Sequence, residues 1–234
     1  VPVITGQDNG NSDFFSDTLT VALGIVGGGA PGGNEIRYTL DASSPEGDSP
    51  LYAEPFAIQG TTVVTARVFS QGQSLGPAVT RTFVRKDTDQ SLGLFYPDAE
   101  TGFWQYRGRE PILALPTLAA ARFSGLGCNP DRGGTLGALY VPATVLSLNG
   151  NTDSTGPKAH NPFCGQRLLR MIDVHPDNLN YCVIDGVLFD KSGTTLLAYP
   201  PAREGDFYAV PDGVQWIAAG AFAWAANLTE IGFP

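Results

Sequence analysis

Val141-Pro-Ala-Thr-Val-Leu-Ser-Leu148 is the stretch that decides how the C-terminal part of this chain folds, because it occurs twice. Its counterpart is Val210-Pro-Asp-Gly-Val-Gln-Trp-Ile217, with the proline and the apolar residues at the same spacing. The match continues downstream at three apolar positions of each copy: Phe163, Leu169 and Ile172, then Phe222, Leu228 and Ile231. One copy offers too few apolar residues to close a core alone, so the repeat predicts units that stack and cover one another.

The spacing resembles the leucine-rich repeats of bacterial surface proteins of the BspA type, in which a Pro-led segment and an Ala-Phe turn recur. Gly220-Ala-Phe222, Asn227-Leu-Thr229 and Ile231-Gly-Phe-Pro234 follow that pattern closely. Residues 174–201 resemble the β-hairpin insertion of these proteins, with strands expected over 187–189 and 195–197 and a turn over 190–193. The resemblance implies an irregular leucine-rich-repeat solenoid over residues 136–234. An insertion around residues 150–161 is expected to form a protruding loop.

The N-terminal part alternates apolar and polar residues with period two, which is typical of half-buried strands. Leu19, Val21 and Leu23 are expected on one face of a strand, and Ile36, Tyr38 and Leu40 on one face of another. Further strands are expected over 61–69 and 79–84, with turns at the glycine-, serine- and proline-rich segments between them, 27–33 among them. Several short strands at this spacing favour an antiparallel sandwich.

Within this part, Glu35-Ile-Arg-Tyr-Thr-Leu-Asp41, Ser43-Ser-Pro45 and Thr62-Val-Val-Thr-Ala-Arg-Val-Phe69 resemble the small domain named after the C-terminal part of chitobiase and β-hexosaminidase. The resemblance implies an immunoglobulin-like β-sandwich over residues 1–85, an accessory module that brings no catalytic residues. A linker and a degenerate capping repeat are expected over 86–135. The predicted fold class is therefore mainly β, a sandwich followed by a short solenoid.

Composition excludes several function classes. The chain has 234 residues, with 14 Lys and Arg against 23 Asp and Glu, so its formal net charge of −9 disfavours binding to nucleic acid or to an anionic membrane surface. The apolar runs are too short for a membrane span of about 20 residues, and the first residues lack a signal-type stretch, so the chain reads as a mature or trimmed product.

Catalytic and metal-binding patterns are weak. The three cysteines, Cys128, Cys164 and Cys182, form no C-x-x-C pair, and they are interpreted as small buried apolar residues, a Cys164–Cys182 disulfide being the alternative. The two histidines, His160 and His175, lie in loop or turn segments without an evident orienting group. The segment 8–13 is rich in oxygen ligands but lacks the order of a calcium loop. Neither a cofactor nor a metal is expected.

Neighbouring carboxylates also give no catalytic pattern. Three pairs of acidic residues stand two positions apart in the sequence: Asp98 and Glu100, Glu204 and Asp206, and Asp87 and Asp89. A glycosidase needs two carboxyl groups that face each other across a cleft, and no cleft can be inferred from this spacing. These acids are interpreted as solvated loop residues. The chain is not expected to be an enzyme.

Aromatic residues are the candidate ligand-binding residues. Trp104, Tyr106 and Trp216 offer flat faces on which sugar rings stack, the alternative being that they pack a domain junction or shield an end of the solenoid. Trp224 is interpreted as a packing residue.

The sequence thus favours a non-enzymatic recognition and adhesion module of a secreted or cell-surface bacterial protein, binding a host or matrix protein through the repeat face. The alternatives are a glycan-binding accessory region of a carbohydrate-processing protein and a structural spacer.

Overall fold

The computed structural model describes residues 1–7, 13–26, 33–86, 93–127, 134–148 and 159–234. The glycine-rich turn at 27–32, the oxygen-rich segment at 8–12, the acidic pair at 87 and 89, and most of the 150–161 insertion lie outside the described residues. The fold is mainly β and the described residues contain no α-helix, which confirms the mainly β class, while the leucine-rich-repeat solenoid stays a prediction. The chain divides into two compact units, Val1–Lys86 and Asp87–Pro234.

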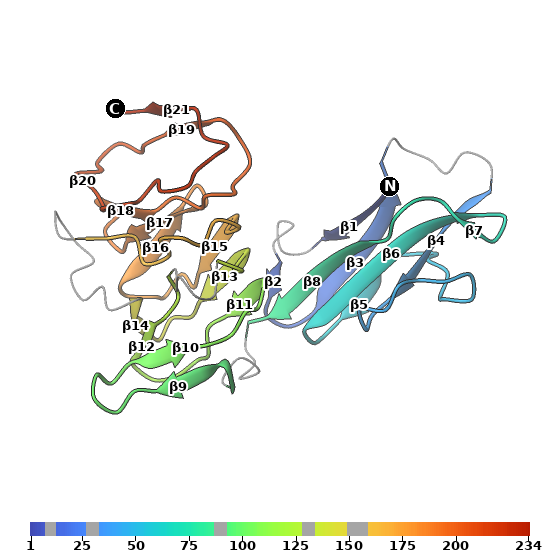
Figure 1. The fold of residues 1–234 in the computed structure, drawn as a ribbon, viewed down its shortest axis with the longest axis horizontal. Helices are drawn as coiled ribbons and strands as arrows, with labels where there is room; N and C mark the ends of the chain where they lie inside the picture. Colours follow the sequence, from blue (N-terminus) through green and yellow to red (C-terminus); the bar gives the residue numbers. More distant parts are fainter. Residues whose placement is uncertain (8–12, 27–32, 87–92, 128–133, 149–158) are drawn as a thin grey trace. The chain divides into compact units, whose positions relative to one another are not determined.

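The first unit is a sandwich of two sheets (Figure 1). One sheet has the order β1-β3-β5 and the other the order β2-β8-β6-β4, with β7 paired to β6. The strands are β1 (Pro2–Gly6), β2 (Phe14–Phe15), β3 (Leu19–Ile25), β4 (Asn34–Thr39), β5 (Phe56–Ile58), β6 (Thr62–Ser70), β7 (Gln73–Ser74) and β8 (Val79–Arg85).

Alternation of side chains across the two sheets builds the core of this unit. Leu19, Val21 and Leu23 of β3 are buried against Val64, Ala66 and Val68 of β6, as the period-two pattern predicts. The expectation that Leu40 lies on the same strand face as Ile36 and Tyr38 is wrong, because β4 ends at Thr39 and Leu40 is 45% exposed. Asp13, buried in this unit, accepts a hydrogen bond from Arg81 Nε at 2.9 Å.

The remaining strands of the described residues belong to the second unit, and each is two to four residues long. They are β9 (Phe95–Pro97), β10 (Trp104–Tyr106), β11 (Ile112–Ala114), β12 (Ala121–Ser124), β13 (Ala138–Val141), β14 (Val145–Leu148), β15 (Met171–Val174), β16 (Tyr181–Ile184), β17 (Val187–Asp190), β18 (Thr195–Ala198), β19 (Phe207–Ala209), β20 (Trp216–Ile217) and β21 (Glu230–Gly232).

Parallel ladders between strands far apart in the sequence organise this unit. Ile112 of β11 pairs with Ala138 of β13, and Ala138 in turn pairs with Met171 of β15. The pairs β10–β12, β12–β14, β18–β20 and β19–β21 are parallel as well. Parallel neighbours need a long connection, so the chain makes one circuit between each strand and the next strand of its ladder. We call each circuit a coil, and β19 to β21 with their connections, residues 207–234, the last coil.

The two copies of the repeat adopt the same local structure. The Val145 amide donates to the Pro142 carbonyl at 3.3 Å, and the Val214 amide donates to the Pro211 carbonyl at 3.4 Å. Equivalent turns follow Phe163 and Phe222: the amides of Gln166 and Ala225 donate to the carbonyls of these residues. An isolated parallel bridge joins the two copies, between His160 in the insertion of the first and Ala219 of the second.

The hairpin expected between the copies is present. β17 and β18 pair antiparallel, and the Gly193 amide donates to the Asp190 carbonyl in the turn between them. β16 adds a third antiparallel strand that the sequence pattern did not predict. The apolar side chains of the second unit gather in one core cluster that contains Val141, Leu148 and Val210. Ile217 is the exception, since it is 42% exposed.

Candidate ligand-binding surface

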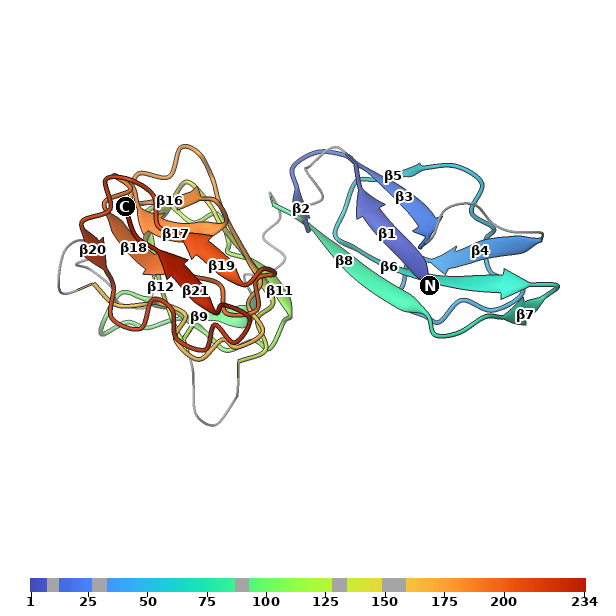
Figure 2. The same cartoon turned by 90° about the horizontal axis from the view of Figure 1, so that it is seen from above.

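The last coil presents its large apolar side chains to solvent. Phe207 of β19, Trp216 and Ile217 of β20, Trp224 in the turn after Phe222, and Phe233 after β21 are all exposed. Figure 2 looks down on this coil, with β19, β20 and β21 nearest the viewer within the second unit. Large apolar side chains concentrated in one segment are characteristic of interaction surfaces, whereas single exposed residues need no explanation.

Backbone pairing holds these side chains in place. Trp216 pairs with Thr195 and Ile217 with Leu196 across the β18–β20 ladder. The Phe207 ring lies beside Gly232, where an added Cβ would approach it to 3.1 Å, so the glycine leaves room for the ring. Such a surface is held by hydrogen-bonded strands, so little conformational entropy is lost when it binds a partner.

Trp224 differs from the packing residue that the sequence suggested. Its side chain is 53% exposed and its φ is +66°, a left-handed conformation that few non-glycine residues adopt. The Arg167 guanidinium lies over its ring at 3.7 Å from the centroid. The indole therefore already binds one cation within the chain.

The three candidate aromatic residues do not lie together. Trp104 and Tyr106 belong to β10, in the sheet of order β14-β12-β10-β9, whereas Trp216 belongs to β20, in the sheet β16-β17-β18-β20. Figure 1 shows β10 and β20 at opposite ends of the second unit. Trp104 is half-buried against the core and Trp216 is 44% exposed.

Tyr106 is a core residue in the structure. It is buried beside Phe95, with ring centroids 5.2 Å apart, and its hydroxyl donates to Glu110 Oε2 at 2.7 Å. Burial, followed by the contact with Glu110, raises the pKa of the Tyr106 phenol. Its ring offers no open face for a sugar, so Trp216 is the member of the candidate set that is placed for contact with a ligand.

The groups considered for catalysis have ordinary structural surroundings. His175 Nδ1 accepts a hydrogen bond from the Asp177 amide at 3.1 Å, within a turn. Asp98 Oδ1 accepts from the amides of Glu100 and Thr101, and the hydrogen bonds from Thr101 lower the pKa of the Asp98 carboxyl. The described residues contain no group of three His, Cys, Asp or Glu side chains that could hold a metal ion.

The cysteines also depart from expectation in part. Cys164 and Cys182 are free thiols, so they form no disulfide with each other, and Cys164 is exposed although it was expected to be buried. Cys182 is half-buried and its thiol donates to the Asp190 carbonyl at 3.1 Å. Burial raises the pKa of the Cys182 thiol, which makes it a poor nucleophile at neutral pH.

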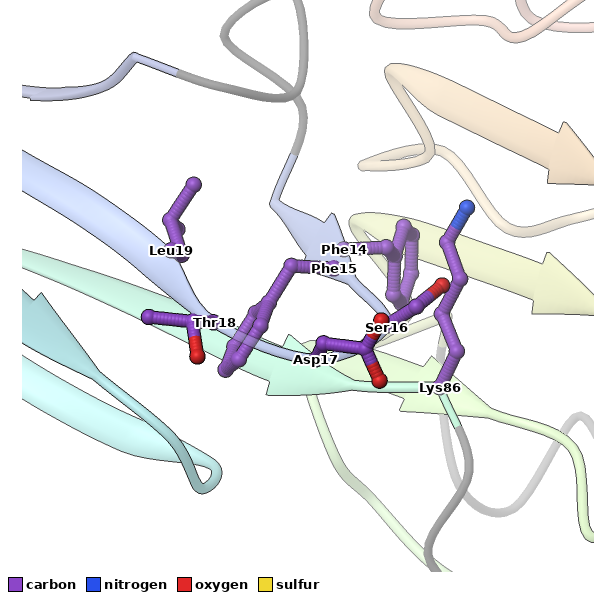
Figure 3. Close-up of a pocket in the computed structure, with 7 residues that line it drawn as sticks. All are labelled: Phe14, Phe15, Ser16, Asp17, Thr18, Leu19 and Lys86. Atoms are coloured by element: carbon purple, nitrogen blue, oxygen red, sulfur yellow. The ribbon is translucent and has the colours of Figure 1, made fainter.

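A depression of about 280 Å³ lies in the first unit, lined by Phe14, Phe15, Ser16, Asp17, Thr18, Leu19 and Lys86 (Figure 3). In this view the Lys86 side chain extends away from the Asp17 carboxylate. The lining combines aromatic rings, hydroxyl groups and one charge of each sign, so it points to no particular class of ligand.

Comparison with known proteins identifies part of the first unit. Residues 30–83, which contain β4 to β7 and most of β8, match the family described as Fn3 associated. This is less than half of the chain. The match lies within the first unit, and the narrower resemblance to the chitobiase domain stays a prediction.

One curated protein and two solved structures are similar over longer stretches. A "Putative beta-glucuronidase" of Formosa agariphila is 28% identical over 145 residues, which are 56% of this chain but 13% of that protein. The pneumococcal vaccine antigen PcpA is 26% identical with a TM-score of 0.36, over 42% of this chain and 22% of PcpA. A leucine-rich repeat protein of Eubacterium ventriosum is 18% identical with a TM-score of 0.31, over 48% of this chain and 32% of its own.

The chain thus spans a small fraction of each of these proteins. Both TM-scores are too low to carry an argument about the fold, so the architecture of the second unit rests on its own strand pairing. Among the described residues, no helix has the length and apolar character that crossing a membrane requires.

Proposed function

We propose that this chain is a non-enzymatic recognition module of a secreted or cell-surface bacterial protein, and that it binds a protein partner through the exposed side of its repeat segment. The observation that carries the proposal is the set of exposed aromatic side chains on the last coil, Phe207, Trp216, Trp224 and Phe233. Aromatic residues on a rigid frame are the usual anchors of protein interfaces. The Fn3-associated match in the first unit supports an accessory rather than a catalytic role.

A binding experiment with matched variants tests this proposal. The purified chain is applied to immobilised host matrix proteins, and binding is compared with that of a Phe207→Ala, Trp216→Ala double variant. Each truncation of an anchor is expected to cost about 2 kcal/mol, so the double variant should bind on the order of 1000-fold more weakly or not at all. Leu179→Ala is the control, because Leu179 is 78% exposed and lies outside the last coil.

Equal binding by the double variant and the parent chain would show that the last coil is not part of the binding interface. The same preparation is assayed with a chromogenic aryl glucuronide, and we expect no turnover. Measurable hydrolysis that survives repurification would overturn the non-enzymatic part of the proposal.

A second candidate function is glycan binding in support of a carbohydrate-processing protein. It is favoured by the exposed Trp216 ring and by the similarity to a protein named as a glucuronidase. A glycan array decides between the two functions. A glycan-array signal that Trp216→Ala abolishes and Trp104→Ala leaves unchanged would indicate that the partner is a sugar and not a protein.

A further inference from the structure

A second exposed surface lies on the sheet of order β14-β12-β10-β9. Figure 1 shows β9, β10 and β12 at the end of the second unit opposite to β19 and β21. One face of this sheet carries core residues, among them Phe95, Tyr106 and Phe123. Because side chains alternate between the two faces of a strand, the residues between them point away from the core. We call this side the outer face of the sheet.

Strand pairing places the residues of the outer face side by side. Gln105 of β10 pairs with Tyr96 of β9 and with Ser124 of β12. Directly paired residues point to the same face of a sheet, and neighbouring strands are about 5 Å apart. Arg122 stands two residues before Ser124, so it shares this face, and it is exposed between two buried neighbours. The Tyr96 side chain is 50% exposed.

A second guanidinium group is held on the same face. Arg107 Nε and Nη2 donate to Gln105 Oε1 at 3.3 and 3.0 Å, and the guanidinium carbon lies 4.9 Å from the centroid of the Tyr96 ring. The β10–β12 register places Arg107 four residues further along the strands than Arg122, so roughly 14 Å separate their backbone positions. Two exposed cations at this separation suit a chain with repeated anionic groups better than one small anion.

The charge of the surrounding segment supports an anionic ligand. Residues 101–172 contain seven Lys and Arg and three Asp and Glu, a net charge of +4, whereas the rest of the chain has seven against 20 and a net charge of −13. Glu110 of this segment accepts a hydrogen bond from the Tyr106 hydroxyl, and Asp98, which follows β9, accepts from amides of its own turn. A polyanion is therefore attracted to this segment although the whole chain is acidic.

The groups on the outer face fit a sugar better than a polypeptide. A protein interface has an apolar core within a polar rim, whereas the exposed aliphatic residue of this sheet, among the residues described, is Leu146 on the edge strand β14. An aromatic ring packs against the C–H groups of a sugar, and the Gln105 amide and the Ser124 hydroxyl can exchange hydrogen bonds with its hydroxyl groups. Guanidinium groups bind oxyanions through two parallel hydrogen bonds.

We propose that the outer face binds an acidic glycan, a polysaccharide with carboxylate or sulfate groups along its chain. Arg107 and Arg122 contact the anionic groups, and Tyr96 and Gln105 contact the sugar rings. This inference rests on the glycan-binding function, the second candidate above, and gives it a surface and a ligand class.

Calorimetry with the full chain and four probes tests the inference. Oligogalacturonate carries a carboxylate on each ring, dextran sulfate carries sulfate groups, dextran is neutral, and poly-L-glutamate is an acidic polypeptide. We expect at least one acidic glycan to bind about 10-fold or more tightly than dextran and poly-L-glutamate, and the probe that binds identifies the anionic group. The affinity should fall between ionic strengths of about 0.01 M and about 1 M, because salt screens the guanidinium groups.

Matched variants separate the outer face from the overall charge. Arg122→Glu should weaken the acidic glycan about 10-fold or more, because a charge-assisted hydrogen bond is replaced by repulsion. Tyr96→Ala should also weaken it, since the ring that contacts the sugar and supports Arg107 is lost. Lys191→Glu makes the same change of charge at an exposed turn outside this sheet and should leave the affinity unchanged. Circular dichroism and urea unfolding verify that the variants are folded.

Three results would overturn the inference. Poly-L-glutamate that binds as tightly as the acidic glycans would identify an acidic polypeptide as the ligand. Failure of both acidic glycans to bind, or equal weakening by Arg122→Glu and Lys191→Glu, would show that the outer face is not a glycan site. If a glycan-array signal is abolished by Trp216→Ala and unchanged by Arg122→Glu, the glycan-binding function stands and this inference fails.

Discussion

Replacing Asn178 by leucine should destabilise the second unit by about 4 kcal/mol. Asn178 is fully buried between the first repeat copy and the hairpin, and its side-chain amide makes four hydrogen bonds. Nδ2 donates to the carbonyls of Pro142 at 2.7 Å and Val145 at 3.2 Å. Oδ1 accepts from the amides of Asn180 and Tyr181, both at 2.8 Å. Leucine has a similar volume but satisfies none of these backbone groups.

The magnitude follows from the backbone groups that the leucine variant leaves without partners. A hydrogen bond of this kind contributes about 1 kcal/mol net, and an unsatisfied buried group costs about 1–3 kcal/mol. Because all four hydrogen bonds are removed and the surroundings relax in part, the free energy of unfolding should fall by about 4 kcal/mol. For a urea dependence of about 2 kcal/mol per molar, the midpoint drops by about 2 M.

Tryptophan fluorescence during urea unfolding is a suitable assay, because all three tryptophans, Trp104, Trp216 and Trp224, belong to the second unit. The signal therefore follows that unit alone. Asn227→Leu is the control: Asn227 is exposed and donates a single hydrogen bond, to the Arg203 carbonyl at 3.2 Å. A loss below about 1 kcal/mol for Asn178→Leu, or a loss equal to that of the control, would refute the reasoning.

Three further predictions concern other parts of the chain. Arg81→Met leaves the Asp13 carboxylate buried without its ion pair, so the first unit should lose on the order of 3 kcal/mol, measured by urea unfolding of that unit in far-UV circular dichroism; an unchanged midpoint would contradict this. Tyr208→Phe removes a buried hydroxyl that has no hydrogen-bond partner, so stability at pH 7 should be equal or slightly higher. Burial raises the pKa of Tyr208 from 10.0 to about 12, so the neutral phenol stabilises the fold below about pH 10 and this contribution disappears as the pH rises toward 12. The phenylalanine variant should therefore lose less stability over that range, as measured by urea midpoints at each pH. In Gly134→Ala the added Cβ would clash with the Gly165 carbonyl oxygen. The free energy of unfolding should therefore fall by about 1–3 kcal/mol, measured as a lower thermal midpoint. A higher midpoint would show that the segment moves aside.

The sequence was sufficient for the parts of the fold that depend on local periodicity. Alternation at Leu19, Val21 and Leu23 places these residues on the buried face of β3, and the hairpin of β17 and β18 follows from two apolar runs joined by a polar turn. The repeated apolar spacing predicted repeated units, and the two copies form equivalent turn hydrogen bonds, to the carbonyls of Pro142 and Pro211. In each case the determining contacts lie within a few residues or on one face of one strand.

The candidate site depended on contacts that no local pattern specifies. Trp104, Tyr106 and Trp216 were grouped by their aromatic character, yet Tyr106 is buried against Phe95 while Trp216 is exposed. Trp224 was expected to pack, and it instead carries the Arg167 guanidinium.

What the sequence determined by itself was the mainly β class, the strand periodicity and the existence of repeated units, because side-chain alternation and turn chemistry act over short distances. Only the tertiary structure decided which copy is covered. Leu148 and Ile217 stand at equivalent positions, and both lie on strands at the edge of a sheet, yet the first is buried in the core cluster while the second is open to solvent, because burial of a side chain depends on which neighbour packs over it. That neighbour is set by the chain's path through space.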